Sequence, residues 1–256
     1  MSLTTRITFS LTESVGTILL EPPEVKPPTL DRKVLSELES CLAEVQHAQP
    51  RLVVVRSASE RFFCVGANIN VLKETTEETI GPWVELGHRV LNRLEDLPMP
   101  VIAVVEGYAM GGGLELAMAC DLIFCSEAAV FAQSEASLGF IPGWGGTRRL
   151  AQRIGVAQAK YFFYSGKLIE ASRAAEIGLV DFVGSEDQLN QELSDFSQSV
   201  LANNPNAISQ FKSIVNDQAG SGRDGNIQAE VIHSITCLKD PDAKARLGDF
   251  LAKRGK

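Results

Sequence analysis

Two glutamates and a run of glycines form the part of this sequence that is best suited to chemistry. Gly111–Gly113 precede Glu115, which lies inside an otherwise apolar run, and a second acid, Glu135, precedes the apolar segment 138–142. An ionised carboxylate in an apolar helix is costly unless the protein uses it. Glycines at a helix N-terminus let an anionic group approach the backbone N–H groups there. The combination predicts an acid/base pair beside an oxyanion-binding site.

The composition is that of an ordinary globular protein with an acidic balance of charge. The 256 residues carry a net charge of −8, with 45% hydrophobic and 22% charged residues. This length allows one large α/β domain, alone or with a smaller helical appendage. A pI of about 5.0 argues against general nucleic-acid binding and against binding to an anionic membrane, because both favour a basic face. We therefore expect neither as a partner.

Cysteine and histidine positions predict no metal site. The five cysteines are scattered without a CxxC pair, and His47, His88 and His233 lack the spacing of metal ligands. No early segment resembles a signal peptide, and no apolar run approaches the length of a membrane span. We expect reduced thiols and a cytoplasmic location.

Apolar periodicity divides the chain into a mixed core over residues 1–200 and a helical region over residues 201–256. The core is predicted to hold strands at 7–11, 15–20, 52–55, 101–105, 122–124 and 130–131, and helices at 30–45, 79–94 and 113–120. Several strands are apolar on both sides, which is typical of sheets covered by helices. Three helices are expected in the second region, at 206–215, at 227–238 and after Asp240, which would cap a helix that begins with Pro241.

Three segments together resemble the enoyl-CoA hydratase/isomerase (crotonase) family, namely 63–68, 107–121 and 132–150. The central block, GYAMGGGLELAMACD, is long and specific, and the resemblance extends over nearly the whole chain. It implies an α/β fold with a crotonase-type ββα superhelical core and a C-terminal helical region that drives assembly into a homotrimer, often doubled to a hexamer. It also implies an acyl-CoA thioester as the substrate. Coenzyme A would be part of that substrate, with no separate cofactor.

By this resemblance, the backbone N–H groups of Ala67 and Gly112 form the oxyanion hole for the thioester oxygen. The partial positive charge of a helix N-terminus would stabilise an enolate there. The alternative for the glycines alone is a tight strand-to-helix turn without a ligand. Gly143 matches the position whose backbone helps to hold the catalytic water.

Glu115 and Glu135 match the two catalytic glutamates of the hydratases. Having both favours addition of water across the 2,3 double bond, where one carboxylate takes a proton from water and the other protonates the α-carbon. The helix dipole favours the ionised form of Glu115, which we assign as the base. Desolvation beside an apolar loop would raise the pKa of Glu135, which suits the proton donor. The alternatives are a helix-capping carboxylate at Glu115 and a surface loop residue at Glu135.

Several residues are expected to contact the substrate, and the resemblance places them at Lys26, Ala67, Asn68, Ile69, Gly111, Trp144 and Lys253. Trp144 is bulkier than the small residue often found at its position, and it either shapes the acyl pocket or simply packs. Asn68 replaces the usual aspartate but remains a suitable helix N-cap.

Two basic positions have open roles in coenzyme A binding. The segment 25–28 replaces the family's Lys-Ala-Leu-Asn pattern at the adenine half of CoA, so Lys26 is either a phosphate ligand or a solvated loop residue. Lys253 and Arg254 either offer a cation to CoA bound by a neighbouring subunit or form a solvated helix end.

Apolar stripes in the last helices predict a partner subunit. Each stripe lies on one helical face, with Ile227, Val231, Ile235 and Leu238 on the first and Leu247, Phe250 and Leu251 on the second. The alternative is that both stripes fold back onto their own core.

The functional alternatives stay close to the same family. An enoyl-CoA isomerase or a cyclic dienoyl-CoA hydratase would use the same oxyanion hole with a different acyl group, and dienoyl-CoA hydratases also carry a proline-bearing loop like 25–28. From another class, the chain could be a non-catalytic crotonase-like binding protein, some of which associate with RNA. The two glutamates and the acidic charge argue against that reading.

Overall fold

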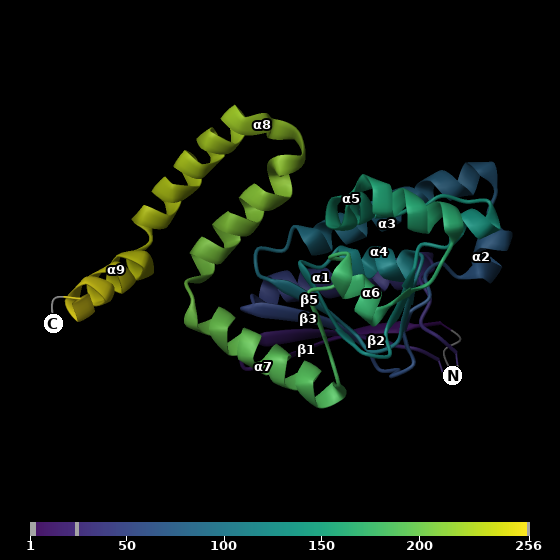
Figure 1. Cartoon of the computed structure of the whole chain (residues 1–256), viewed down its shortest axis with the longest axis horizontal. Coiled ribbons are helices and arrows are strands. Elements are labelled where there is room, and N and C mark those ends of the chain that lie inside the picture. Colours follow the sequence, from purple (N-terminus) through teal and green to yellow (C-terminus); the bar gives the residue numbers. More distant parts are fainter. Residues whose placement is uncertain (1–3, 24–25, 255–256) are drawn as a thin grey trace.

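The computed structural model of the chain describes residues 4–23 and 26–254, without the side chains at 218–229, 238, 248 and 250–254. This part of the chain holds two sheets and the helices that cover them (Figure 1). The strands are β1 (Arg6–Thr12), β2 (Val15–Glu21), β3 (Leu52–Ser57), β4 (Phe62–Cys64), β5 (Val101–Val105), β6 (Tyr108–Met110), β7 (Leu122–Ser126), β8 (Val130–Ala132), β9 (Ile169–Glu170) and β10 (Phe182–Gly184). The helices are α1 (Arg32–Ala48), α2 (Ile69–Lys73), α3 (Glu77–Glu95), α4 (Gly112–Met118), the 3-10 turn η1 (Glu135–Leu138), α5 (Gly146–Ser165), α6 (Ala171–Glu176), α7 (Glu186–Ala202), α8 (Pro205–Lys239) and α9 (Pro241–Arg254).

From β3 to β8, successive strands alternate between the two sheets. The larger sheet has the order β1-β2-β3-β5-β7-β10, and the smaller has the order β4-β6-β8-β9. β1 and β2 pair antiparallel, whereas β2, β3, β5, β7 and β10 run parallel to their neighbours. In the smaller sheet β4, β6 and β8 are parallel. The pairs β3–β4, β5–β6 and β7–β8 each place one strand in each sheet before the chain turns into a helix. This arrangement confirms the predicted ββα superhelical core.

The central strands of the larger sheet are buried on both faces. Val53 and Val55 of β3 face the main core, which also contains residues of α1, α3 and α4. Leu52 and Val54 face the opposite side, where they join a second cluster with Leu189 of α7. Because helices cover both faces, these strands need no polar side, and their sequences are continuous apolar runs.

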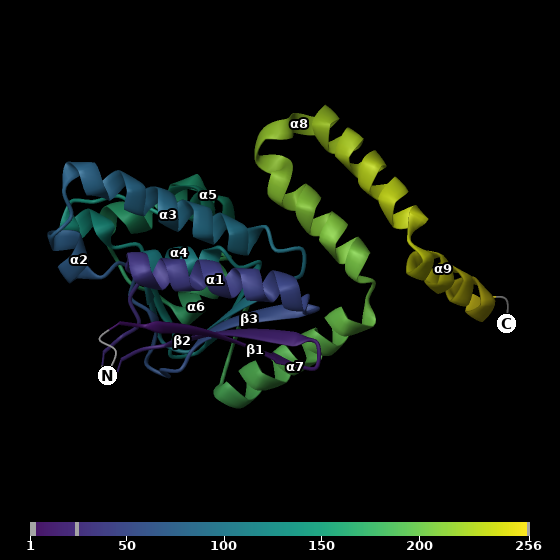
Figure 2. The same ribbon diagram turned by 180° about the vertical axis from the view of Figure 1, so that it is seen from behind.

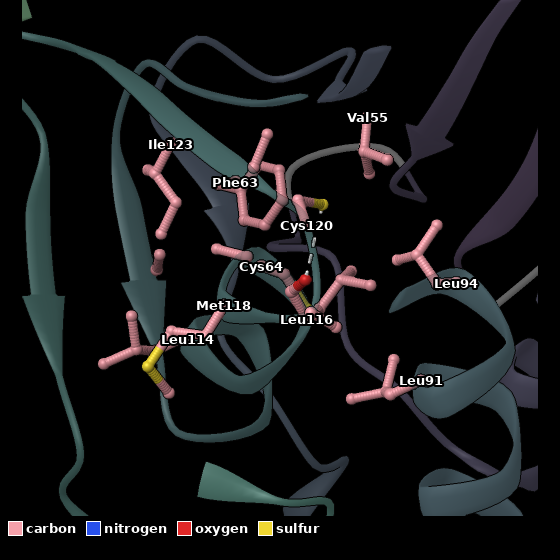
Figure 3. Packing of buried hydrophobic residues seen from close by; sticks show 14 of the residues in the cluster. Val55, Phe63, Cys64, Leu91, Leu94, Leu114, Leu116, Met118, Cys120 and Ile123 are labelled. Carbon is pink, nitrogen blue, oxygen red and sulfur yellow. Dashed lines mark hydrogen bonds between the residues drawn. The ribbon is translucent and has the colours of Figure 1, made fainter. Parts of the chain in front are cut away.

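α4 has no exposed face, since every residue from Gly112 to Met118 is buried. Figure 3 shows Leu114, Leu116 and Met118 packed among side chains from the strands and from α3, including Leu91 and Leu94. A helix enclosed on all sides is fixed in position, and so is its N-terminal turn. The fold therefore holds Gly112 and Glu115 rigidly.

The C-terminal region differs from the predicted three helices. Residues 206–215 and 227–238 both belong to the single element α8, so the prediction of separate helices was wrong. A helix tolerates glycines such as those between the two segments at a cost of about 1 kcal/mol each, so the chain stays helical there. In Figures 1 and 2, α8 consists of two arms joined by a sharp bend, and α8 and α9 extend away from the sheets.

Other expectations for this region have mixed outcomes. Asp240 caps α9 as predicted, because its Oδ1 accepts the N–H of Asp242 at 3.0 Å. Val231, Ile235 and Leu247 are exposed, so these members of the apolar stripes do not fold back onto the core. The side chains of Ile227, Leu238, Phe250 and Leu251 lie outside the described residues. The boundary expected at residue 200 falls in the last turn of α7 and stays a prediction. Over the described ranges, none of the helices has the length and apolarity of a membrane span.

Candidate active site

A cavity of 380 Å³ lies at the N-terminal end of α4. The three segments that carry the family resemblance meet there, although they are far apart in the sequence. Eight of the predicted site residues line it, namely Ala67, Ile69, Gly111, Gly112, Glu115, Glu135, Gly143 and Trp144. The lining is otherwise mostly apolar, so the few polar groups inside it are the ones that can orient a ligand.

The N–H groups of Ala67 and Gly112 lie on backbone segments that touch. Gly66 (φ +85°) turns the chain so tightly that a Cβ there would lie 2.7 Å from the Gly112 nitrogen. The parallel bridge to Leu30 uses the carbonyl of Gly66 and the N–H of Asn68, not the N–H of Ala67. Gly112 begins α4, where an N–H has no acceptor within the helix. Among the described residues neither N–H has a hydrogen-bond acceptor, so two adjacent donors remain for a ligand.

Glu115 is a buried carboxyl held by the loop before α5. It is 2% exposed, and its Oε1 accepts hydrogen bonds of 2.7 Å from the backbone N–H groups of Trp144 and Gly146. Burial raises the pKa of Glu115 to about 7, although the two backbone N–H groups lower it, and the charge of Glu135 raises it further. Because desolvation has the larger effect, the net shift of the Glu115 pKa is upward, opposite to the direction that the helix dipole favours.

Glu135 faces the same cavity from η1. Its Oε1 accepts a hydrogen bond of 2.6 Å from Nε2 of Gln133, whereas its Oε2 is buried and has no partner among the described residues. Burial raises the pKa of Glu135, as predicted, and the Gln133 hydrogen bond opposes that rise. Gly111 (φ +51°) leaves room for this carboxylate, since a Cβ there would lie 3.2 Å from Oε1. Two carboxyls with raised pKa values thus share one cavity, as an acid/base pair requires.

Arg149 is a positioning residue that the sequence analysis missed. It is 2% exposed and donates to the carbonyl of Trp144 at 2.7 Å, to Asn92 Oδ1 at 2.8 Å and to Glu95 Oε2 at 2.7 Å. These contacts tie the loop before α5 to the end of α3. The positive charge also lowers the pKa of Glu115. The available signal was a pair of arginines, Arg148 and Arg149, shortly after the glycine-rich loop.

One face of α3 forms a wall of the cavity and was also missed. Ile80, Trp83, Val84 and His88 follow helical spacing and all line it. The pKa of His88 is lowered by burial and by the charges of Arg149 and Arg148, which favours its neutral imidazole. The apolar periodicity of 79–94 predicted the helix but not which face met the site.

The remaining predicted residues lie outside this lining. Asn68 caps α2, because its Oδ1 accepts the N–H of Asn70 at 3.1 Å, and this confirms its expected capping role. Lys26 is exposed in the loop before α1. Lys253 and Arg254 belong to α9, and their side chains are not described. Within the described ranges, no group of three acidic, cysteine or histidine residues could hold a metal ion.

The comparisons with known proteins agree with this geometry. Residues 10–254 match the family described as enoyl-CoA hydratase/isomerase. The short-chain-enoyl-CoA hydratase of Clostridium acetobutylicum is 33% identical over 226 residues, which cover 88% of this chain and 87% of the relative. The crotonyl-CoA hydratase of Syntrophomonas wolfei is 30% identical over 226 residues, with 88% and 87% covered. This chain therefore belongs to the enoyl-CoA hydratase/isomerase family and is an enzyme of that family.

Solved structures show the same fold. The enoyl-CoA hydratase of Bacillus anthracis superposes with a TM-score of 0.90 at 32% identity, covering 97% of this chain and 96% of that chain. An enoyl-CoA hydratase structure from Geobacillus kaustophilus gives a TM-score of 0.92 at 27% identity, covering 98% and 96%.

Proposed function

We propose that this enzyme adds water across the 2,3 double bond of a 2-enoyl-CoA thioester. The observation that carries the proposal is the meeting of two groups in one cavity: Glu115 and Glu135, both with raised pKa values, and the adjacent N–H groups of Ala67 and Gly112. The first pair can move protons near neutral pH. The second can hold an oxyanion.

The reaction needs both pairs. A carboxylate takes one proton from water while the water oxygen bonds to C3 of the substrate. The π electrons of the double bond move to the thioester oxygen, where the Ala67 and Gly112 N–H groups would stabilise the resulting enolate. The enolate then takes a proton at C2 from the second carboxyl. The product has gained one hydrogen at C2 and one hydroxyl group at C3, and proton exchange between the carboxyls restores the enzyme.

We assign Glu115 as the base and Glu135 as the acid. The two backbone N–H groups that donate to Glu115 Oε1 favour the carboxylate, which is the form that can take a proton from water. The Oε2 atom of Glu135 is buried and has no partner in the described part of the chain, which favours a protonated carboxyl that can donate. Gly143, in the loop between the two acids, would help to hold the water with its backbone. The division of roles follows the environments of the two carboxyls.

Coenzyme A enters this proposal as part of the substrate, with no further cofactor. Ile69, Gly111 and Trp144 would contact the acyl and thioester groups, since they line the cavity. Asn68 would support substrate binding indirectly, by capping α2. Lys26 and Lys253 would contact the nucleotide half of coenzyme A outside the cavity. We further propose that the chain assembles as a homotrimer or a hexamer.

The direct test follows the absorbance of the conjugated enoyl thioester when the enzyme is mixed with 2-butenoyl-CoA. Hydration predicts loss of that absorbance and formation of a 3-hydroxyacyl-CoA, and Glu115→Gln should prevent both. A 3-enoyl-CoA assayed in parallel separates the main alternative, because an isomerase would generate absorbance from it. Turnover of the 3-enoyl thioester without hydration of the 2-enoyl thioester would contradict the proposal.

A further inference from the structure

Trp144 is a large side chain seated between two glycines. It is 4% exposed. A Cβ on Gly87 of α3 would lie 2.1 Å from its Cδ1 atom, and a Cβ on Gly112 would lie 2.3 Å from its Cζ3 atom. The indole therefore reaches from α3 to the first residue of α4, and it fits because neither neighbour carries a side chain.

The indole is fixed rather than mobile. The Trp144 N–H donates to Glu115 Oε1 at 2.7 Å, and its carbonyl accepts from Arg149 at 2.7 Å. Its ring meets that of Trp83 edge to face, with centroids 5.8 Å apart and planes at 62°. A residue anchored at its backbone and packed at its ring cannot swing aside without breaking these contacts.

This ring stands where an acyl chain would extend. The Gly112 N–H is one of the two donors that would hold the thioester oxygen, and Cζ3 of Trp144 touches the same glycine. An acyl group anchored there would lie close to the indole, because Gly112 and Trp144 line the same cavity. The other nearby walls, formed by Leu72, Ile80 and Val84, are apolar and favour a hydrocarbon.

We infer that Trp144 is the specificity-determining residue of the acyl pocket and restricts the substrate to short hydrocarbon enoyl groups such as 2-butenoyl. This inference rests on the proposed function. Longer chains would have to displace a close-packed ring, and overpacking of such a wall is unfavourable. A misfit of one methylene in an apolar pocket changes kcat/KM by roughly 10-fold or more.

The test compares kcat/KM for 2-butenoyl-CoA and 2-decenoyl-CoA in three proteins. The wild-type enzyme should favour butenoyl by about 10-fold or more, and Trp144→Ala should remove or reverse that preference. Leu91→Ala is the matched control. Leu91, on α3, is a large apolar side chain that is buried, like Trp144, but it does not line the cavity. The control should keep the wild-type preference. A wild-type preference for decenoyl, or an unchanged preference in Trp144→Ala, would overturn the inference.

Substitution of Gly87, on the α3 side of the indole, provides a second test of the same contact. Gly87→Ala places a Cβ against the indole and should lower kcat/KM for butenoyl-CoA, whereas the same change in the Trp144→Ala background should cost nothing. Equal losses in both backgrounds would contradict the inference. Trp144→Phe removes less of the side chain and should weaken the preference for butenoyl by a smaller amount. This variant keeps the test valid if Trp144→Ala does not fold.

Binding of the saturated thioesters separates this inference from the proposed reaction. Dissociation constants of butanoyl-CoA and decanoyl-CoA need no turnover, and Trp144→Ala should strengthen only the second. If the enzyme hydrates neither enoyl thioester but binding shifts in this way, the proposed function fails and the role of Trp144 stands. If binding of both saturated thioesters changes equally, the role of Trp144 is wrong.

Discussion

The backbone N–H of Gly146 donates a hydrogen bond of 2.7 Å to Oε1 of Glu115 and so links the first turn of α5 to the first turn of α4. The contact is tight, because a Cβ on Gly146 would lie 3.0 Å from Cγ of Glu115. Backbone N–H groups favour a carboxylate as an anion, whereas burial disfavours it. The pKa of about 7 is the balance of these opposing effects.

Replacing either acid should remove most of the hydration activity. Glu115→Gln and Glu135→Gln should each lower kcat by on the order of 10²–10⁴, the usual contribution of a general acid or base. Affinity for a saturated acyl-CoA should change far less, because neither carboxyl is placed to hold the nucleotide. Glu127→Gln, at an exposed turn, is the matched control. Steady-state hydration of 2-butenoyl-CoA measures the effect, and near-normal turnover in one acid variant would remove that residue from the mechanism.

The pH dependence of kcat should report the two carboxyls. Glu115 must be ionised to act as the base, so its titration near pH 7 should form one limb of the profile. Glu135 must be protonated to act as the acid, so its ionisation, at its own raised pKa, should form the other limb. The two limbs predict a bell-shaped profile for the wild-type enzyme. A rate that stays constant from pH 6 to pH 8 would contradict the role of Glu115, because its titration near pH 7 would then not affect turnover.

Glu115→Gln should stabilise the folded protein at alkaline pH while it removes activity. The pKa of Glu115 is about 7 in the folded protein against an ordinary value of 4.5, so above pH 7 the native state holds a disfavoured charge. At 1.36 kcal/mol per pKa unit, relief of that charge adds up to about 3 kcal/mol to the free energy of unfolding. Below pH 4.5 both states are protonated and the gain disappears. Urea unfolding of both proteins at pH 8 and at pH 4 measures the difference, and a variant that is less stable at pH 8 would exclude this explanation.

The sequence predicted the elements of the core better than the interactions that join them. β3 and β5 were predicted because strands buried on both faces leave continuous apolar runs. The link from Arg149 to Trp144 and Glu95 was not predicted, because it depends on the packing of α5 against α3. The raised pKa of Glu115 was not predicted for the same reason. Its position in a helix is local information, whereas its burial arises only when distant segments close over it.

The oxyanion hole predicts a definite geometry with ligand bound. In a crystal structure with a 3-hydroxyacyl-CoA, the thioester oxygen should lie roughly 2.7–3.1 Å from the nitrogens of Ala67 and Gly112. Gly66→Ala should lower kcat by about 10²-fold or more, because its Cβ would lie 2.7 Å from the Gly112 nitrogen. Gly155→Ala is the control, since Gly155 also has a positive φ but nothing within 4 Å of its Cβ position. An oxygen bound elsewhere in a productive complex would rule out this oxyanion hole.

The exposed apolar residues of α8 and α9 predict that the chain assembles with copies of itself. Val231 and Leu247 are 54% and 55% exposed, and the two helices extend away from the sheets (Figure 2). Such faces are covered by a partner in stable proteins. Deletion of residues 240–256 should therefore reduce the mass of the oligomer and weaken acyl-CoA affinity together.

A full-length protein with Lys253→Ala and Arg254→Ala separates these two effects. If the terminal cations reach the CoA of a neighbouring subunit, the double variant should keep the oligomer and lose affinity only, and the loss should shrink as salt screens the phosphate charge. Light scattering at micromolar concentration measures the mass, and calorimetry measures binding. A monomeric intact protein would exclude the assembly, because a site completed by a neighbouring subunit requires that the neighbour be present.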